Sequence, residues 1–139
     1  MPGTRRKART IALQVLYEVD SATHDAEETL ERLANEFPLP VEGAEFARGL
    51  VTGVLTNKER LDTIIQNHAP AWPVQQLTAI DRNILRIAIF EILLDNRVPT
   101  KVAINEAVDL AKTFGSDNSS RFVNGVLGSV SAQVSEERG

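Results

Sequence analysis

The sequence predicts an all-α protein. Apolar residues recur at spacings of three and four along most of the chain, no convincing alternation with a period of two is present, and no repeat or low-complexity linker interrupts the pattern. With 139 residues, 42% of them hydrophobic and 24% charged, the chain can bury a core but is too short for two full domains. We therefore expect one domain over residues 1–139, built from about seven helices.

Capping residues and prolines place the helices along the chain. Asp25, followed by Glu28, forms an N-terminal capping pattern, and Asn57 is expected to cap the fourth helix. Pro38 and Pro40 end the second helix, because proline cannot continue a helix. The expected helices span approximately residues 4–20, 25–36, 41–56, 57–68, 78–96, 100–114 and 119–134.

Three local features of the second half lead to further expectations. The helix over 78–96 is apolar on almost every face after Asn83, so it should be the central, most enclosed element. Gly115 is expected to end the sixth helix in a left-handed conformation. The pair Asn124-Gly125 is a strong hairpin signal, but the helical spacing of the surrounding apolar residues favours a helix. Gly125 and Gly128 then suggest that another backbone or a ligand approaches closely.

Positive charge is concentrated at the start of the chain. Four of the 15 basic residues, Arg5, Arg6, Lys7 and Arg9, precede the first acidic residue, Glu18, which leaves 11 basic against 19 acidic residues beyond them. The net charge of −4 thus divides into +4 and −8. Such a division favours a localised contact with a polyanion such as nucleic acid, while the alternative is a solvated basic tail.

The first helix is expected to carry two faces. One face gathers Arg6, Arg9, Leu13 and Tyr17, whereas the face that should pack inward carries Ala8, Ile11, Ala12, Val15, Leu16 and Val19. Arginine neutralises phosphate, and an exposed tyrosine ring offers a surface on which an unstacked base can lie. Tyr17 could instead pack against a second helix, as aromatic residues of helices commonly do.

The residue content argues against catalysis and against membrane insertion. The chain has no cysteine, no phosphate-binding or zinc-protease motif, and only two histidines, His24 and His68, neither of which the sequence pairs with a nucleophile or a metal-ligand set. Its most apolar stretch, residues 84–94, is well short of the ~20 residues that span a bilayer. We expect a soluble cytoplasmic protein that is not an enzyme and needs no metal or cofactor.

Three segments resemble the NusB family of bacterial transcription antitermination factors. They are RRKARTIALQVLYEVD, LTAIDRNILRIAIFEIL and VPTKVAINEAVDLAKTFGSDNSSRFVNGVLGSV, in that order, and the resemblance covers nearly the whole chain. It implies two packed helical bundles and binding of boxA-type single-stranded RNA. It also implies a heterodimer with the ribosomal protein NusE, within an RNA polymerase complex that reads through terminators, notably in rRNA operons.

The resemblance also implies which residues carry these contacts. By position, RNA binding falls on Arg5, Arg6, Lys7, Arg9, Tyr17, Ser119, Arg121 and Phe122. Asp81 matches the surface used toward NusE. Spacing alone favours a core position for Phe122, which continues an apolar stripe, and Ser119 is expected to cap a helix whose first turn has free amides.

Two other hypotheses compete with RNA-binding antitermination. The chain could be a helical protein-interaction adaptor whose basic end only aids solubility, or an accessory factor for an rRNA methyltransferase. The residues also leave monomer and homodimer open, and some members of the family self-associate through the arginine-rich surface.

Overall fold

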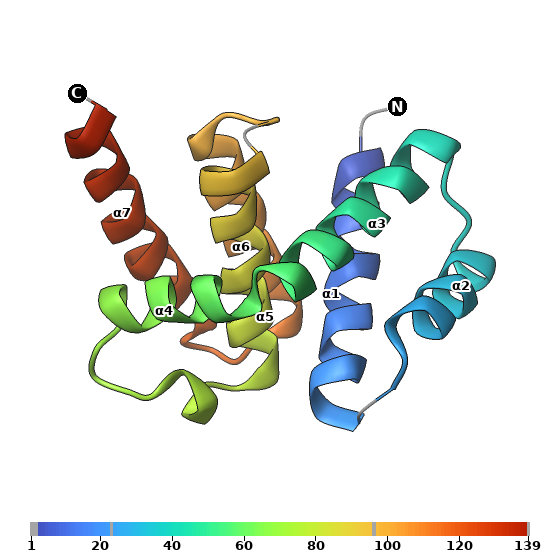
Figure 1. Cartoon of the computed structure of the whole chain (residues 1–139), viewed down its shortest axis with the longest axis horizontal. Coiled ribbons are helices and arrows are strands. Elements are labelled where there is room, and N and C mark those ends of the chain that lie inside the picture. Colours follow the sequence, from blue (N-terminus) through green and yellow to red (C-terminus); the bar gives the residue numbers. More distant parts are fainter. Residues whose placement is uncertain (1–2, 23, 96, 139) are drawn as a thin grey trace. The chain divides into compact units, whose positions relative to one another are not determined.

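A computed structural model of the chain describes residues 3–22, 24–95 and 97–138. These residues form seven α-helices with one 3₁₀ and one π-helical segment and no strand, so the predicted all-α fold is confirmed (Figure 1). The elements are α1 (Thr4–Ala22), α2 (Ala26–Glu36), α3 (Val41–Thr56), α4 (Lys58–His68), η1 (Val74–Gln76), α5 (Ala79–Ile89), η2 (Phe90–Asp95), α6 (Thr100–Phe114) and α7 (Ser119–Arg138). They fall into two compact units, Met1–Thr56 and Asn57–Gly139.

In the first unit, α1 packs against both α2 and α3. The predicted inner face of α1 is buried as far as Leu16, and Val19 is half-buried. The first turns of α1 and α3 come so close that a β-carbon at Gly43 would lie 2.7 Å from Cγ2 of Thr4. The predicted cap of α2 is confirmed, because Oδ2 of Asp25 accepts a hydrogen bond from the Glu28 amide at 3.0 Å.

In the second unit, α5 packs against α4, α6 and α7 and is the central helix, as predicted. Its residues from Asn83 to Ile89 are all buried. Arg86 ties α5 to α4: its Nε and Nη2 donate to the two carboxylate oxygens of Asp62 at 2.7 and 2.9 Å, and Nη1 donates to Oδ1 of Asn83 at 3.1 Å. A bidentate guanidinium–carboxylate pair fixes geometry as well as charge, so it holds the two helices in register.

Several local predictions in this unit are wrong in detail. The predicted helix over 78–96 is regular only as far as Ile89 and continues as the π-helical η2, while its expected last residue, Asn96, lies outside the described residues. The side chain of Asn57 makes no capping hydrogen bond to α4. A β-carbon at Gly125 or Gly128 would meet no heavy atom within 4 Å, so nothing in the described chain approaches either glycine closely.

Gly115 ends α6 for a different reason from the one predicted. Its φ of −91° and ψ of −171° are extended and not left-handed. A β-carbon there would lie 2.7 Å from the carbonyl oxygen of Ala111 and would overlap the side chain of Ser119. Glycine is therefore required by close packing at the α6–α7 turn and not by backbone conformation.

Within residues 3–22, 24–95 and 97–138, no helix combines the length and the hydrophobicity that a bilayer crossing requires.

Candidate nucleic-acid interface

The four basic residues at the start of α1 do not lie on one surface. Arg5, Arg6 and Lys7 are exposed, but Arg9 is buried with 3% of its surface accessible. The prediction that Arg9 shares an exposed face with Tyr17 is therefore wrong, and Leu13 of the same predicted face is buried as well.

The cause is an aromatic ring on α3. The guanidinium carbons of Arg5 and Arg9 lie 5.0 and 5.2 Å from the centre of the Phe46 ring, which is itself buried. A guanidinium within about 6 Å of a ring face is attracted by the ring quadrupole, and this attraction strengthens when water is excluded. Arg9 therefore helps to hold α1 against α3, and Arg5 has an intramolecular partner although it remains in contact with solvent.

The exposed side of α1 carries polar and aromatic groups that water can reach. Tyr17 is 41% exposed, which decides against the alternative that it is a core residue. Arg6, Lys7 and Gln14 are exposed on this side too. We call these four side chains the α1 face. They combine two cations with one aromatic ring on a helix whose opposite side is anchored in the core.

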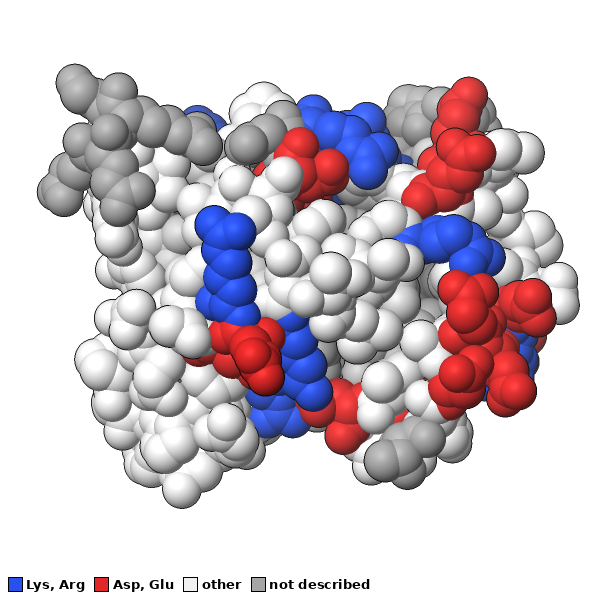
Figure 2. Space-filling model, in the orientation of Figure 1, with Lys and Arg blue, Asp and Glu red and all other residues white. Residues whose placement is uncertain are grey.

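Negative charge is concentrated elsewhere in the same unit. Figure 2 shows acidic side chains gathered over α2 and the start of α3. The exposed carboxylates of these two helices are Glu27, Glu28, Glu31, Glu36, Glu42 and Glu45. Because like charges repel, these helices disfavour a polyanion and leave the α1 face as the electrostatically favoured surface of this unit.

The second predicted group lies at the start of α7, in the other unit. Ser119 is 2% exposed, and its Oγ accepts a hydrogen bond from the Ser116 amide at 2.8 Å. The expectation that Ser119 caps a helix with free amides is therefore wrong: its hydroxyl closes the preceding turn. Arg121 is exposed and Phe122 is half-buried, so Arg121 is the accessible cation of this group.

Asp81, the residue expected to face a protein partner, is largely enclosed in the first turn of α5. It is 9% exposed, and its Oδ1 has no hydrogen-bond partner among the described residues. Its backbone amide donates to Oγ1 of Thr78 at 3.1 Å, so Thr78 caps the helix. An unsatisfied buried oxygen typically costs about 1–3 kcal/mol, which a donor from a partner would recover.

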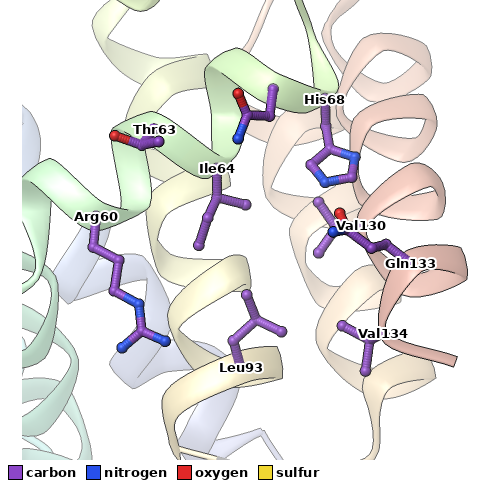
Figure 3. A pocket seen from close by; sticks show the side chains of 9 residues that line it. Arg60, Thr63, Ile64, His68, Leu93, Val130, Gln133 and Val134 are labelled. Carbon is purple, nitrogen blue, oxygen red and sulfur yellow. The ribbon is translucent and has the colours of Figure 1, made fainter. Parts of the chain in front are cut away.

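The pairing of His68 with Ser129 could not be predicted from the sequence. Nδ1 of His68 lies 2.8 Å from Oγ of Ser129, so the expectation that this histidine has no hydroxyl partner is wrong. The two residues are 61 positions apart, and no local motif signals their meeting. His68 borders a cavity of about 430 Å³ between α4, η2 and α7, shown in Figure 3.

The lining of this cavity does not complete a hydrolytic site. Figure 3 shows Arg60, Ile64, Leu93 and Val134 around the cavity, and no carboxylate is among its described lining residues. A Ser–His pair needs a third group to orient the imidazole before it can activate the hydroxyl. Among the described residues no group of three or more histidines, aspartates or glutamates could hold a metal ion.

The comparisons with known proteins agree with the fold and with the sequence segments quoted above. The model of the NusB family matches residues 6–132. The chain belongs to the NusB family. This confirms the resemblance seen in the sequence, and it extends the match across the region between Glu36 and Trp72, where the sequence offered only helix pattern.

Relatives of this NusB family member are transcription antitermination proteins. The chain is 55% identical over 136 residues to transcription antitermination protein NusB of Dehalococcoides mccartyi, covering 98% of this chain and 95% of the relative. It is 51% identical to that of Chloroflexus aggregans over 140 residues, covering 99% and 93%.

Two solved structures resemble it as well. NusB of T. maritima is 32% identical and superposes with a TM-score of 0.84, covering 91% of this chain and 89% of that one. A NusB chain from the crystal structure of the antitermination factors NusB and NusE in complex with dsRNA is 27% identical, with a TM-score of 0.85, covering 94% and 97%.

Proposed function

We propose that this NusB family member is an RNA-binding transcription antitermination factor. It binds boxA-type single-stranded RNA together with the ribosomal protein NusE and promotes read-through by RNA polymerase, notably of rRNA operons. It works in the cytoplasm and acts by binding alone, without a catalytic step or cofactor. Family membership supports this proposal, and the complex of a related NusB with NusE and dsRNA supports the pairing with NusE and the binding of RNA.

The observation that carries the proposal is the α1 face. Arg6 and Lys7 can contact phosphates, while Tyr17 can stack on a base from the same side of the helix. Arg5 and Arg121 add exposed positive charge, and Phe122 is half-exposed. Arg9 and Ser119 contribute by holding the helices that carry these groups, because both are buried.

A salt titration tests the proposal. Four exposed cations, Arg5, Arg6, Lys7 and Arg121, predict a slope of roughly −3 for the logarithm of the binding constant against that of salt, since each phosphate contact on a single strand contributes about −0.7. Binding of boxA-type RNA is measured with and without the NusE-type partner. Arg6→Ala should reduce the slope to roughly −2.

Arg60→Ala is the matched control, because Arg60 is an exposed arginine of α4 outside both groups, and it should leave the slope unchanged. A binding constant that does not depend on salt would overturn the proposal, and so would an Arg6→Ala variant with the same slope as the Arg60→Ala control. Stable partner binding without RNA affinity in the complex would support the protein-interaction adaptor instead.

The same titration followed by light scattering examines self-association. We propose that any homodimer forms through the α1 face, the same surface that would hold RNA. Addition of RNA should therefore convert dimer to monomer. A dimer that persists at saturating RNA would show that the two surfaces differ.

A further inference from the structure

A cavity of about 400 Å³ opens beside α1 in the first unit. One wall comes from Lys7, Thr10 and Gln14 of α1, and the opposite wall comes from Phe37, Pro38 and Leu39 in the segment between α2 and α3. Two of the α1 residues, Lys7 and Gln14, belong to the α1 face. The cavity therefore continues directly from the surface proposed above to contact RNA.

Phe37 is held at this cavity with its ring in solvent. The side chain is 54% exposed, although burying a phenylalanine typically stabilises a protein by about 1.5–3 kcal/mol. Its backbone is fixed, because its amide donates to the carbonyl oxygen of Leu33 at 2.8 Å and the next residue is Pro38. An aromatic ring carried on a fixed backbone at the edge of a cavity can take a second flat ring with a smaller loss of conformational freedom than one on a mobile loop.

The polar groups of the cavity suit a neutral base better than a phosphate. Gln14 makes no side-chain hydrogen bond within the described chain, so its amide can both donate to and accept from a base edge. Thr10 donates its hydroxyl to the Arg6 carbonyl at 3.1 Å and keeps its oxygen free to accept. Glu36 is the carboxylate of the lining, and it would repel a phosphate placed inside.

Lys7 brings positive charge to the α1 wall of the cavity. Lys7 makes no ion pair with another described residue, and Arg6 precedes it in the first turns of α1. A phosphate bound by Lys7 would leave its own base within reach of the apolar wall formed by Phe37. Contacts to the RNA phosphates then position the strand while the cavity binds a base. Recognition of single-stranded RNA commonly combines these two kinds of contact.

We propose that this cavity is a base-binding subsite in which an unstacked nucleobase of the RNA lies on the ring of Phe37, with Gln14 on its edge and its phosphate against Lys7. The proposal rests on the RNA-binding function proposed above. It adds an aromatic contact on a segment outside the residues that the family resemblance assigns to RNA.

The test separates stacking from charge. Phe37→Ala should weaken binding of boxA-type RNA by about fivefold to a hundredfold, the range expected for one base–aromatic stack, while the salt slope stays at the wild-type value. Lys7→Ala should lower the slope by about 0.7. Phe37→Tyr should restore wild-type affinity, and Val41→Ala, which trims an exposed apolar side chain outside this cavity, should change nothing.

Fluorescence locates the base directly. 2-Aminopurine placed at successive RNA positions should be quenched at one position by wild-type protein and remain bright at that position with Phe37→Ala. Wild-type affinity of the Phe37→Ala variant, with an unchanged quenching pattern, would overturn the subsite and leave the RNA-binding function standing. Failure of the wild-type protein to bind the RNA at all would overturn both.

Discussion

Arg9 and Arg6 lie three residues apart on one basic helix, yet the structure predicts opposite consequences when each is removed. Arg9→Ala deletes a desolvated guanidinium that lies 5.2 Å from the centre of the Phe46 ring. Such a contact is worth about 2 kcal/mol when water is excluded, so the free energy of unfolding should fall by about that amount. The salt slope of RNA binding should not change, because Arg9 has almost no surface to offer a phosphate.

Arg6→Ala should leave stability nearly unchanged and reduce the salt slope of RNA binding. Arg6 is exposed, so the free energy of unfolding should change by no more than about 1 kcal/mol, whereas the salt slope should lose about 0.7. Urea unfolding gives the free energy of unfolding of each variant, and RNA titration at several salt concentrations gives the salt slope of each. The reasoning would be refuted by an Arg9→Ala variant that unfolds like the wild type and loses as much slope as Arg6→Ala.

A double-mutant cycle tests whether the stability lost in Arg9→Ala comes from the contact with the Phe46 ring. Phe46→Leu keeps an apolar side chain of similar size but removes the π-system, so Arg9→Ala should cost much less in that background. A coupling energy of about 1–2 kcal/mol is expected from a direct cation–π contact. Strictly additive losses would mean that Arg9 stabilises the unit through contacts other than the one with the Phe46 ring.

Three further outcomes follow from single contacts. Arg86→Met should lower the free energy of unfolding by about 3 kcal/mol in denaturant titrations, because it strands the carboxylate of Asp62, and adding Asp62→Asn should recover part of the loss. Gly115→Ala should destabilise by about 1–3 kcal/mol through overlap, whereas Gly125→Ala should stabilise by up to about 1 kcal/mol, and equal effects would contradict the packing argument. Asp81→Asn should weaken binding of a NusE-type partner about tenfold in calorimetry, since a charged acceptor strengthens a hydrogen bond; unchanged affinity would remove Asp81 from that interface.

Helix positions could be predicted well because their signals are local. The bounds of α3 match the prediction at both ends, and Asp25 caps α2 as its spacing indicates. The enclosure of α5 followed from apolar residues on almost every face. In each case the deciding residues lie within a few positions of one another, so periodicity and capping rules suffice.

The candidate site could be predicted only in part, because its accessibility depends on distant partners. A helical wheel assigns Arg9 to a face but cannot show that Phe46 of another helix shields it. The pair formed by His68 and Ser129 is equally invisible in either local sequence. The exposure of Phe37 could not be predicted, because a single aromatic residue followed by Pro38 and Pro40 belongs to no periodic apolar pattern.

The turn between α6 and α7 has a consequence for how related sequences should be compared. The Ser119 side chain and the Ala111 carbonyl oxygen both occupy the space that a β-carbon at Gly115 would need, so a side chain at 115 requires a smaller residue at 119 and a shift of the turn. A related sequence with a larger residue at 115 should therefore carry glycine at 119 and a different turn between α6 and α7. Conservation of glycine at 115 across an alignment would then reflect packing between two helix ends and not binding of RNA.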